Sequence, residues 1–248
     1  MLLDNYLKLK KENLFLILLI IFSFLVRIPI IIIFGDITID NEWETLLYNL
    51  VSHKTLSLEN FGEFLLPNLW LPPLYAYYLF LLSFLNLEYQ NYVLLVLYSQ
   101  ALLASISVLV FYKLNKFFFS QNICIFSSLL FSLFPLYLYT ASQISSISLT
   151  IFLAIYFYYF FFKIKKDKKY IDVILYSLLA GLLILVRREF IAIIILSSFY
   201  LFLFCKIPFK KIFLIFLITT LTVLPYLIRN YIIFEKVIIH AGFGYNLW

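Results

Sequence analysis

Residues 14–34 read LFLILLIIFSFLVRIPIIIIF, and Arg27 is the one charged residue in this run. A helix crosses the hydrocarbon core of a bilayer, about 30 Å thick, with about 20 apolar residues. The run does not alternate between apolar and polar residues, as the strands of a membrane barrel do. Backbone groups in lipid must bond within their own structure, so the run predicts a membrane-spanning α-helix.

The composition of the whole chain extends this prediction. Of the 248 residues, 65% are hydrophobic and 13% are charged, whereas soluble domains carry about 25% charged residues. Apolar runs of spanning length recur along the chain, and no segment has the composition of a soluble domain. The predicted fold class is an all-α polytopic membrane protein, with residues 1–248 forming a single transmembrane helical domain.

The lysines predict which loops face the cytoplasm. They gather in four clusters: Lys8/Lys10/Lys11, Lys113/Lys116, Lys163/Lys165/Lys166/Lys168/Lys169 and Lys206/Lys210/Lys211. Cytoplasmic loops of membrane proteins are enriched in Lys and Arg, so these clusters predict a cytoplasmic N-terminus and a chain that leaves and returns between clusters. About seven spans result, near residues 13–34, 90–112, 122–141, 145–162, 171–187, 189–205 and 212–230.

A shorter apolar segment, 74–87, follows Pro72 and Pro73. Proline suits the first turn of a helix, where its missing N–H is not needed. A span here would place Lys113 and Lys116 outside, against the charge pattern. We therefore expect a juxtamembrane helix that caps the preceding loop.

That loop, residues 35–73, reads GDITIDNEWETLLYNLVSHKTLSLENFGEFLLPNLWLPP and is predicted to be external. It holds six of the 13 acidic residues of the chain: Asp36, Asp40, Glu42, Glu44, Glu59 and Glu63. A carboxylate beside the bilayer acts as a general base toward an acceptor hydroxyl or amine, and Asp40 and Glu42 are the leading candidates. The alternative is a solvated loop without chemistry. Glu59 and Glu63 are expected to be solvated charges on a helix surface.

Arg187, Arg188 and Arg229 each end a predicted span on the external side. The planar fork of arginine matches phosphate oxygens, so these residues are candidates for holding a lipid phosphate. Simple anchoring at the interface is the alternative. Arg27 lies inside the first span, where a loop carboxylate or a lipid phosphate is its expected partner.

Four motifs, in order, carry a family resemblance. They are residues 40–44 (DNEWE), 71–75 (LPPLY), 180–188 (AGLLILVRR) and 225–231 (PYLIRNY), the last followed by 242–248 (GFGYNLW). With these motifs the chain resembles the GT-C superfamily of membrane glycosyltransferases, in the branch of protein O-mannosyltransferases and lipid A aminoarabinose transferases.

The resemblance implies a GT-C-like bundle with juxtamembrane helices in its first external loop. It implies a hexosyl- or pentosyltransferase that uses a polyprenyl-phosphate-linked sugar and a lipid, glycan or protein acceptor, in a bacterial plasma membrane. Asp40, with Glu42 as the near alternative, matches the loop carboxylate of the family. Arg187, Arg188 and Arg229 match its phosphate-binding basic residues. No metal ligand, cofactor or nucleic acid is expected.

The chain also departs from this family. Residues 142–148 hold no carboxylate where many relatives have one, and Leu71 stands where a lysine is common. Relatives continue through more helices, so a chain truncated at Trp248 is expected. Two other functions stay open: a non-catalytic or degenerate membrane subunit, and a transporter of lipid-linked glycans.

Overall fold

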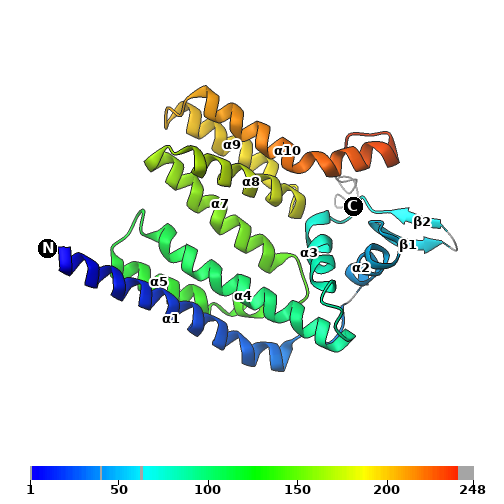
Figure 1. Cartoon of the computed structure of the whole chain (residues 1–248), viewed down its shortest axis with the longest axis horizontal. Helices are drawn as coiled ribbons and strands as arrows, with labels where there is room; N and C mark the ends of the chain where they lie inside the picture. The colour runs from blue at the N-terminus through cyan, green and yellow to red at the C-terminus, as the bar shows by residue number, and fades with distance from the viewer. Residues whose placement is uncertain (1, 40, 62–63, 240–248) are drawn as a thin grey trace. The chain divides into compact units, whose positions relative to one another are not determined.

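The computed structural model describes residues 2–39, 41–61 and 64–239 and is mainly helical (Figure 1). Its elements are α1 (Leu2–Phe34), α2 (Asn41–His53), β1 (Ser57–Phe61), β2 (Phe64–Pro67), α3 (Pro73–Ser83), α4 (Tyr89–Asn115), α5 (Gln121–Leu133), α6 (Pro135–Thr140), α7 (Ile147–Asp167), α8 (Tyr170–Val186), α9 (Phe190–Leu203) and α10 (Phe209–Phe234).

Four of the described helices are long and apolar enough to cross a membrane. They are Glu12–Phe34 of α1, and the whole of α4, α7 and α10. The coarse prediction of an all-α membrane protein agrees with this structure. The other three expected spans form shorter helices: α8 and α9 have 17 and 14 residues, and residues 122–141 divide into α5 and α6.

The division between α5 and α6 comes from Pro135. Proline has no N–H to donate, and its ring disfavours a helical conformation of the preceding residue. Phe134 accordingly has an extended backbone, with φ −62° and ψ 120°. The sequence therefore breaks a predicted continuous span into two pieces.

The chain forms two compact units, and the expected single domain stays a prediction. The first unit comprises residues 1–37 and 93–155. Arg27 is fully buried within it, and its guanidinium carbon lies 4.9 Å from the ring centre of Tyr137. One terminal nitrogen of Arg27 donates to the carbonyl and hydroxyl oxygens of Ser23, both at 2.6 Å. The side chain turns back along its own helix, and no carboxylate of the described loop residues contacts it; its Nε and second terminal nitrogen are buried without a hydrogen-bond partner in the described structure, and a lipid phosphate stays a prediction.

Asp36 has a structural role in the same unit. Its carboxylate accepts a hydrogen bond of 2.6 Å from the N–H of Ile144, and its own N–H donates to the carbonyl of Ser142. The amide of Gln143 donates to the carbonyl of Phe34 at 2.9 Å. The acidic residue that follows α1 thus satisfies backbone groups in the loop before α7, groups that burial would otherwise leave unpaired.

The second unit comprises residues 38–92 and 156–248. In it α8 and α10 lie side by side and α9 contacts both (Figure 1). Gly181 allows the close approach of α8 to α10, since a Cβ at this position would lie 2.5 Å from the Cβ of Thr222. Thr219 also donates to the carbonyl of Ser177 at 3.2 Å. Small residues at such contacts let helix backbones pack closely in membranes.

The stretch before α4 is folded rather than an open loop. It contains α2, an antiparallel hairpin of β1 and β2, and α3. The helix predicted at 74–87 is α3, which begins at Pro73 and ends earlier, at Ser83. Asn86, at φ 49°, adopts the left-handed conformation that commonly follows a helix end.

The hairpin corrects one prediction. Glu59, expected on a helix surface, lies in β1 opposite Leu66. Exposure alternates along β2, as it does in a strand whose successive side chains point to opposite faces. Glu63 lies outside the described residues.

The predicted topology places Phe64 and Lys166 on opposite sides of the membrane. Both residues are exposed, so a single cysteine at either position, with Cys124 and Cys205 replaced by serine, should react with a membrane-impermeant maleimide. We expect Phe64→Cys to label from outside intact cells and Lys166→Cys only after the membrane is opened. Labelling of both positions from the same side would contradict the lysine-based topology.

Candidate functional site

The candidate site lies in the second unit, where the segment that follows residue 37 meets the C-terminal end of α10. Helix α2 buries one face there, with Leu46, Asn49 and Leu50 at helical spacing. Glu42 lies in the first turn of the same helix and is exposed. A negative charge at this position is favourable beside the positive end of the helix dipole. Asp40, the other predicted carboxylate, lies outside the described residues.

Arg229 connects α10 to the hairpin. One terminal nitrogen of its guanidinium donates to the carbonyl of Asn68 at 2.8 Å, and the other donates to the carbonyl of Leu56 at 2.7 Å. The first nitrogen also donates to the side-chain oxygen of Asn230 at 2.8 Å. Bonds from a charged donor are stronger than bonds between neutral groups. The sequence predicts that the guanidinium group of Arg229 holds a phosphate. In the structure this group holds the two sides of the hairpin base against α10.

Asn68 organises the other side of this junction. Its side-chain oxygen accepts from the N–H groups of Trp70 and Leu71, at 2.8 and 2.9 Å, and its side-chain amide donates to the carbonyl of Leu71. Its own N–H donates to the carbonyl of Leu56 at 2.8 Å. Asparagine commonly bonds to the backbone two or three residues ahead and so fixes a turn. This turn directs the chain toward Pro72 and Pro73, where α3 begins.

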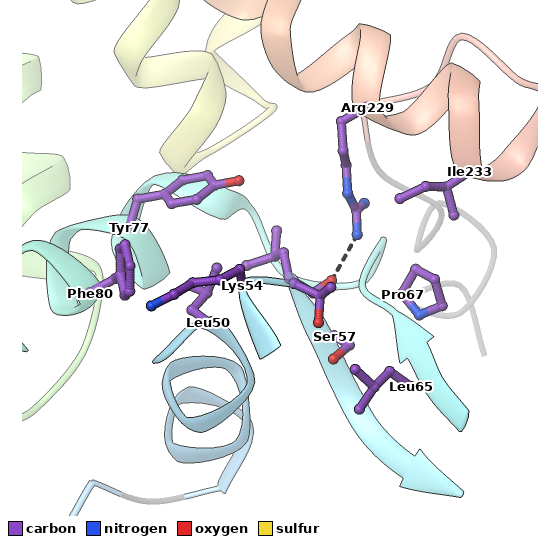
Figure 2. Close-up of a pocket in the computed structure, with 11 residues that line it drawn as sticks. Leu50, Lys54, Ser57, Leu65, Pro67, Tyr77, Phe80, Arg229 and Ile233 are labelled. Carbon is purple, nitrogen blue, oxygen red and sulfur yellow. Dashed lines mark hydrogen bonds between the residues drawn. The ribbon is translucent and has the colours of Figure 1, made fainter. Parts of the chain in front are cut away.

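A cavity of about 340 Å³ lies beside Arg229, between α2, the hairpin, α3 and α10 (Figure 2). Most of its wall is apolar. The polar residues that line it come from four separate elements or connections; they are Lys54, Thr55, Ser57, Tyr77 and Arg229. The apolar lining consists of Leu50, Leu56, Leu65, Pro67, Phe80 and Ile233.

The charges of this cavity are one-sided. Lys54 and Arg229 are cations, and no carboxylate lines the cavity within the described part of the chain. The ammonium group of Lys54 donates to the carbonyl of Val51 at 3.0 Å and lies 5.4 Å from the ring centre of Phe80. An ammonium group has three donors, so the bond to Val51 leaves capacity for an anion.

Two hydroxyl groups add neutral donors. Ser57 is 1% exposed, and its Oγ has no hydrogen-bond partner among the residues that the structure describes; buried polar groups are normally paired. Burial raises the pKa of Tyr77, while the positive charge of Arg229 opposes that shift. The phenol of Tyr77 therefore stays protonated at neutral pH and is able to donate. Two cations and two hydroxyl donors in a mostly apolar wall suit an anionic group attached to an apolar body.

Of the three predicted arginines, only Arg229 lines the cavity. Arg187 directly follows α8 and is exposed. The Nε of Arg188 lies 3.8 Å from a carboxylate oxygen of Glu189. The structure does not bring these two residues into the cavity wall with Arg229.

Sequence reasoning missed Lys54 and Ser57. One signal for Lys54 was present: it is the single lysine in residues 35–73, the loop predicted to be external, whereas the four lysine clusters are predicted to be cytoplasmic. No sequence signal marked Ser57, because its burial depends on the hairpin. Elsewhere in the described residues, no three His, Cys, Asp or Glu side chains gather as ligands for a metal ion.

Comparison with known proteins gives no assignment: no protein-family model, no curated protein and no solved structure matches this chain.

The role of Arg229 at the hairpin predicts a local loss of stability. Arg229→Met removes the hydrogen bonds to Asn68 and Leu56 and should destabilise the chain by about 2 kcal/mol. Hydrogen–deuterium exchange should rise mainly at residues 54–71. The control is Arg187→Met, an exposed arginine without bonds to the hairpin, which should change stability by less than about 0.5 kcal/mol. Equal exchange in both variants would rule out this role.

Proposed function

We propose that this chain is a membrane glycosyltransferase of the GT-C type, with seven spans. It moves a sugar from a polyprenyl-phosphate carrier to an acceptor at the external face of the membrane. The observation that carries the proposal is the cavity beside Arg229, which offers two cations and no described carboxylate within a mainly apolar wall. A carrier lipid combines these properties, since it joins a phosphate to a long apolar chain.

The position of the cavity supports the same substrate. It lies at the C-terminal end of α10, one of the four helices long enough to span a membrane. A phosphate bound at the end of a spanning helix is at the depth of lipid head groups, and the apolar part of its carrier continues into the bilayer. Arginine and lysine are the usual binders of phosphate in proteins.

In the proposed reaction, a carboxylate takes the proton of the acceptor hydroxyl or amine. The acceptor atom then bonds to the anomeric carbon of the sugar, and the bond between that carbon and the phosphate oxygen breaks. The carrier leaves as polyprenyl phosphate, whose charge Lys54 and Arg229 stabilise. Asp40 is the proposed base, with Glu42 as the alternative two residues later in the chain.

A second function is favoured by one feature of the site. The described wall of the cavity contains cations and hydroxyl groups but no base. A subunit that binds a lipid phosphate and performs no transfer would need only these groups. Both functions require binding of a lipid phosphate, but only the transferase also breaks the bond between the sugar and the phosphate. Binding and reaction are therefore tested separately.

Binding is tested at Lys54. The purified chain in neutral detergent should retain undecaprenyl phosphate in native mass spectrometry, and Lys54→Met should weaken retention by about 10- to 100-fold through loss of one charged hydrogen bond. Lys236→Met is the matched control, because Lys236 is exposed, is predicted to lie on the same side of the membrane and does not line the cavity. Equal retention by both variants would contradict a phosphate site at this cavity.

Reaction is tested at the two carboxylates. Release of undecaprenyl phosphate from a panel of hexose- and pentose-linked donors is measured in membranes that contain the chain. Asp40→Asn should lower the rate by about 10²–10⁴-fold, the usual effect of removing a general base. Loss of rate in Glu42→Gln alone would move the base to Glu42. Binding without release in the wild-type chain would favour the non-catalytic subunit.

A further inference from the structure

A strongly basic surface lies in the second unit, at the opposite end of α10 from the cavity. There α7 and α9 end and α8 and α10 begin, all at one side of the helical layer (Figure 1). Residues 163–172 and 204–211 together contain eight lysines and two aspartates. We call these two segments the lysine end of the unit.

One lysine joins the two segments, and another joins the first segment to α9. The ammonium group of Lys211 donates to the carbonyl of Lys168 and lies 4.4 Å from the ring centre of Tyr170. Lys165 donates to the hydroxyl of Tyr200 at 3.4 Å, which connects the last turn of α7 to α9. Lysines that are about 40 residues apart in sequence therefore share one surface.

The positive charge of this surface is mostly unneutralised. Asp172 is fully buried and pairs with Lys163 at 2.8 Å. Among the described residues, the remaining lysines of the two segments form no ion pair, and all of them except Lys211 are exposed. Lys211 is 9% exposed, and a carbonyl and an aromatic ring, rather than a carboxylate, contact its ammonium group. A buried ammonium group favours a nearby anion, because burial removes the water that would otherwise stabilise its charge.

Two helices add their N-terminal ends to the same surface. Helices α8 and α10 have 17 and 26 residues, and neither N-cap residue, Lys169 or Pro208, provides a side-chain hydrogen bond to the first turn. The unpaired N–H groups and the dipole of a helix N-terminus favour anions, phosphate in particular. The lysines and both helix ends therefore attract the same kind of ligand.

Aromatic side chains beside the lysines place that ligand at a membrane. Tyr170, Phe204 and Phe209 are 57%, 73% and 69% exposed. The helices α7 and α10, which end and begin here, are long enough to span a bilayer. A tyrosine ring at the end of a spanning helix belongs at the level of lipid head groups. The exposed rings of Phe204 and Phe209 favour an apolar neighbour, which a free soluble phosphate does not provide.

We propose that the lysine end binds the phosphate head group of an anionic phospholipid through Lys168, Lys206 and Lys211. Clusters of lysine at the ends of spanning helices bind anionic lipid head groups through this charge attraction. This site is separate from the cavity beside Arg229 and does not depend on the proposed transferase activity.

The backbone conformation of two lysines allows substitutions that remove charge without straining the chain. Lys168 and Lys206 have φ angles of 52° and 50°, in the left-handed region where glycine is the favoured residue. Lys168→Gly with Lys206→Gly therefore removes two charges and leaves both turns in a conformation that the new residues prefer. The control is Lys113→Gln with Lys116→Gln, which removes two lysines from another cluster predicted to lie on the same side of the membrane.

The experiment measures binding of dioleoyl-phosphatidylglycerol to the purified full chain in neutral detergent, by native mass spectrometry and by the shift of the thermal unfolding midpoint. Dioleoyl-phosphatidylcholine and inorganic phosphate are the other two arms. We expect phosphatidylglycerol alone to bind and to raise the midpoint. The glycine double variant should bind it more weakly by on the order of 30-fold, about fivefold per lysine. The glutamine double variant should bind it as the wild type does.

Three results would overturn the proposal. Equal binding of the two phospholipids by the wild-type chain would show that charge does not select the lipid. An equal loss of binding in both double variants would show general attraction to a basic protein rather than a site. A midpoint shift with inorganic phosphate as large as that with phosphatidylglycerol would assign the surface to a soluble anion.

Discussion

In lipid a backbone N–H or C=O cannot bond to water, and the rest of this structure depends on that constraint. Helices satisfy it along their length but not at their ends, where several groups lack partners. Three polar side chains of this apolar chain bond to backbone groups in the segments that connect its elements. Asp36 bonds to Ile144 in the loop before α7, Arg229 bonds to two carbonyls at the hairpin base, and Lys211 bonds to the carbonyl of Lys168.

The sequence was sufficient where one property decides the structure. Apolar length alone predicts α1, α4, α7 and α10, and the two prolines at 72 and 73 predict the start of α3. The sequence was insufficient where an apolar run is barely long enough to span a membrane. Pro135 divides one expected span, and α9 has 14 residues. The hairpin was missed because its strands are short and its position depends on bonds to Asn68 and Arg229, which are distant from each other in sequence.

The sequence also predicted only some residues of the candidate site. A charge near the end of a spanning helix marks Arg229 as a candidate for binding a phosphate, but its hydrogen bonds to carbonyls depend on the fold of residues 56–68. Arg187 and Arg188 have the same sequence signal and do not line the cavity. Sequence position places such residues at one depth in a membrane, whereas the packing of the helices decides which of them face the same space.

The hydrogen bonds of Arg229 bear on how its function is to be understood. A guanidinium has five N–H donors, and Arg229 uses three hydrogen bonds to hold the hairpin and Asn230. Those bonds fix the orientation of the cation beside the cavity, and fixed donors lose little freedom when a ligand binds. Substitution of Arg229 therefore changes the fold and the charge of the cavity together. Lys54 differs, because its ammonium group bonds to its own helix end through Val51 and lies over the ring of Phe80 in α3. Neither partner belongs to the hairpin, so its charge is separable from the position of the hairpin. Of the two cations in the cavity, Lys54 is consequently the one whose removal reports on ligand binding with the least effect on structure.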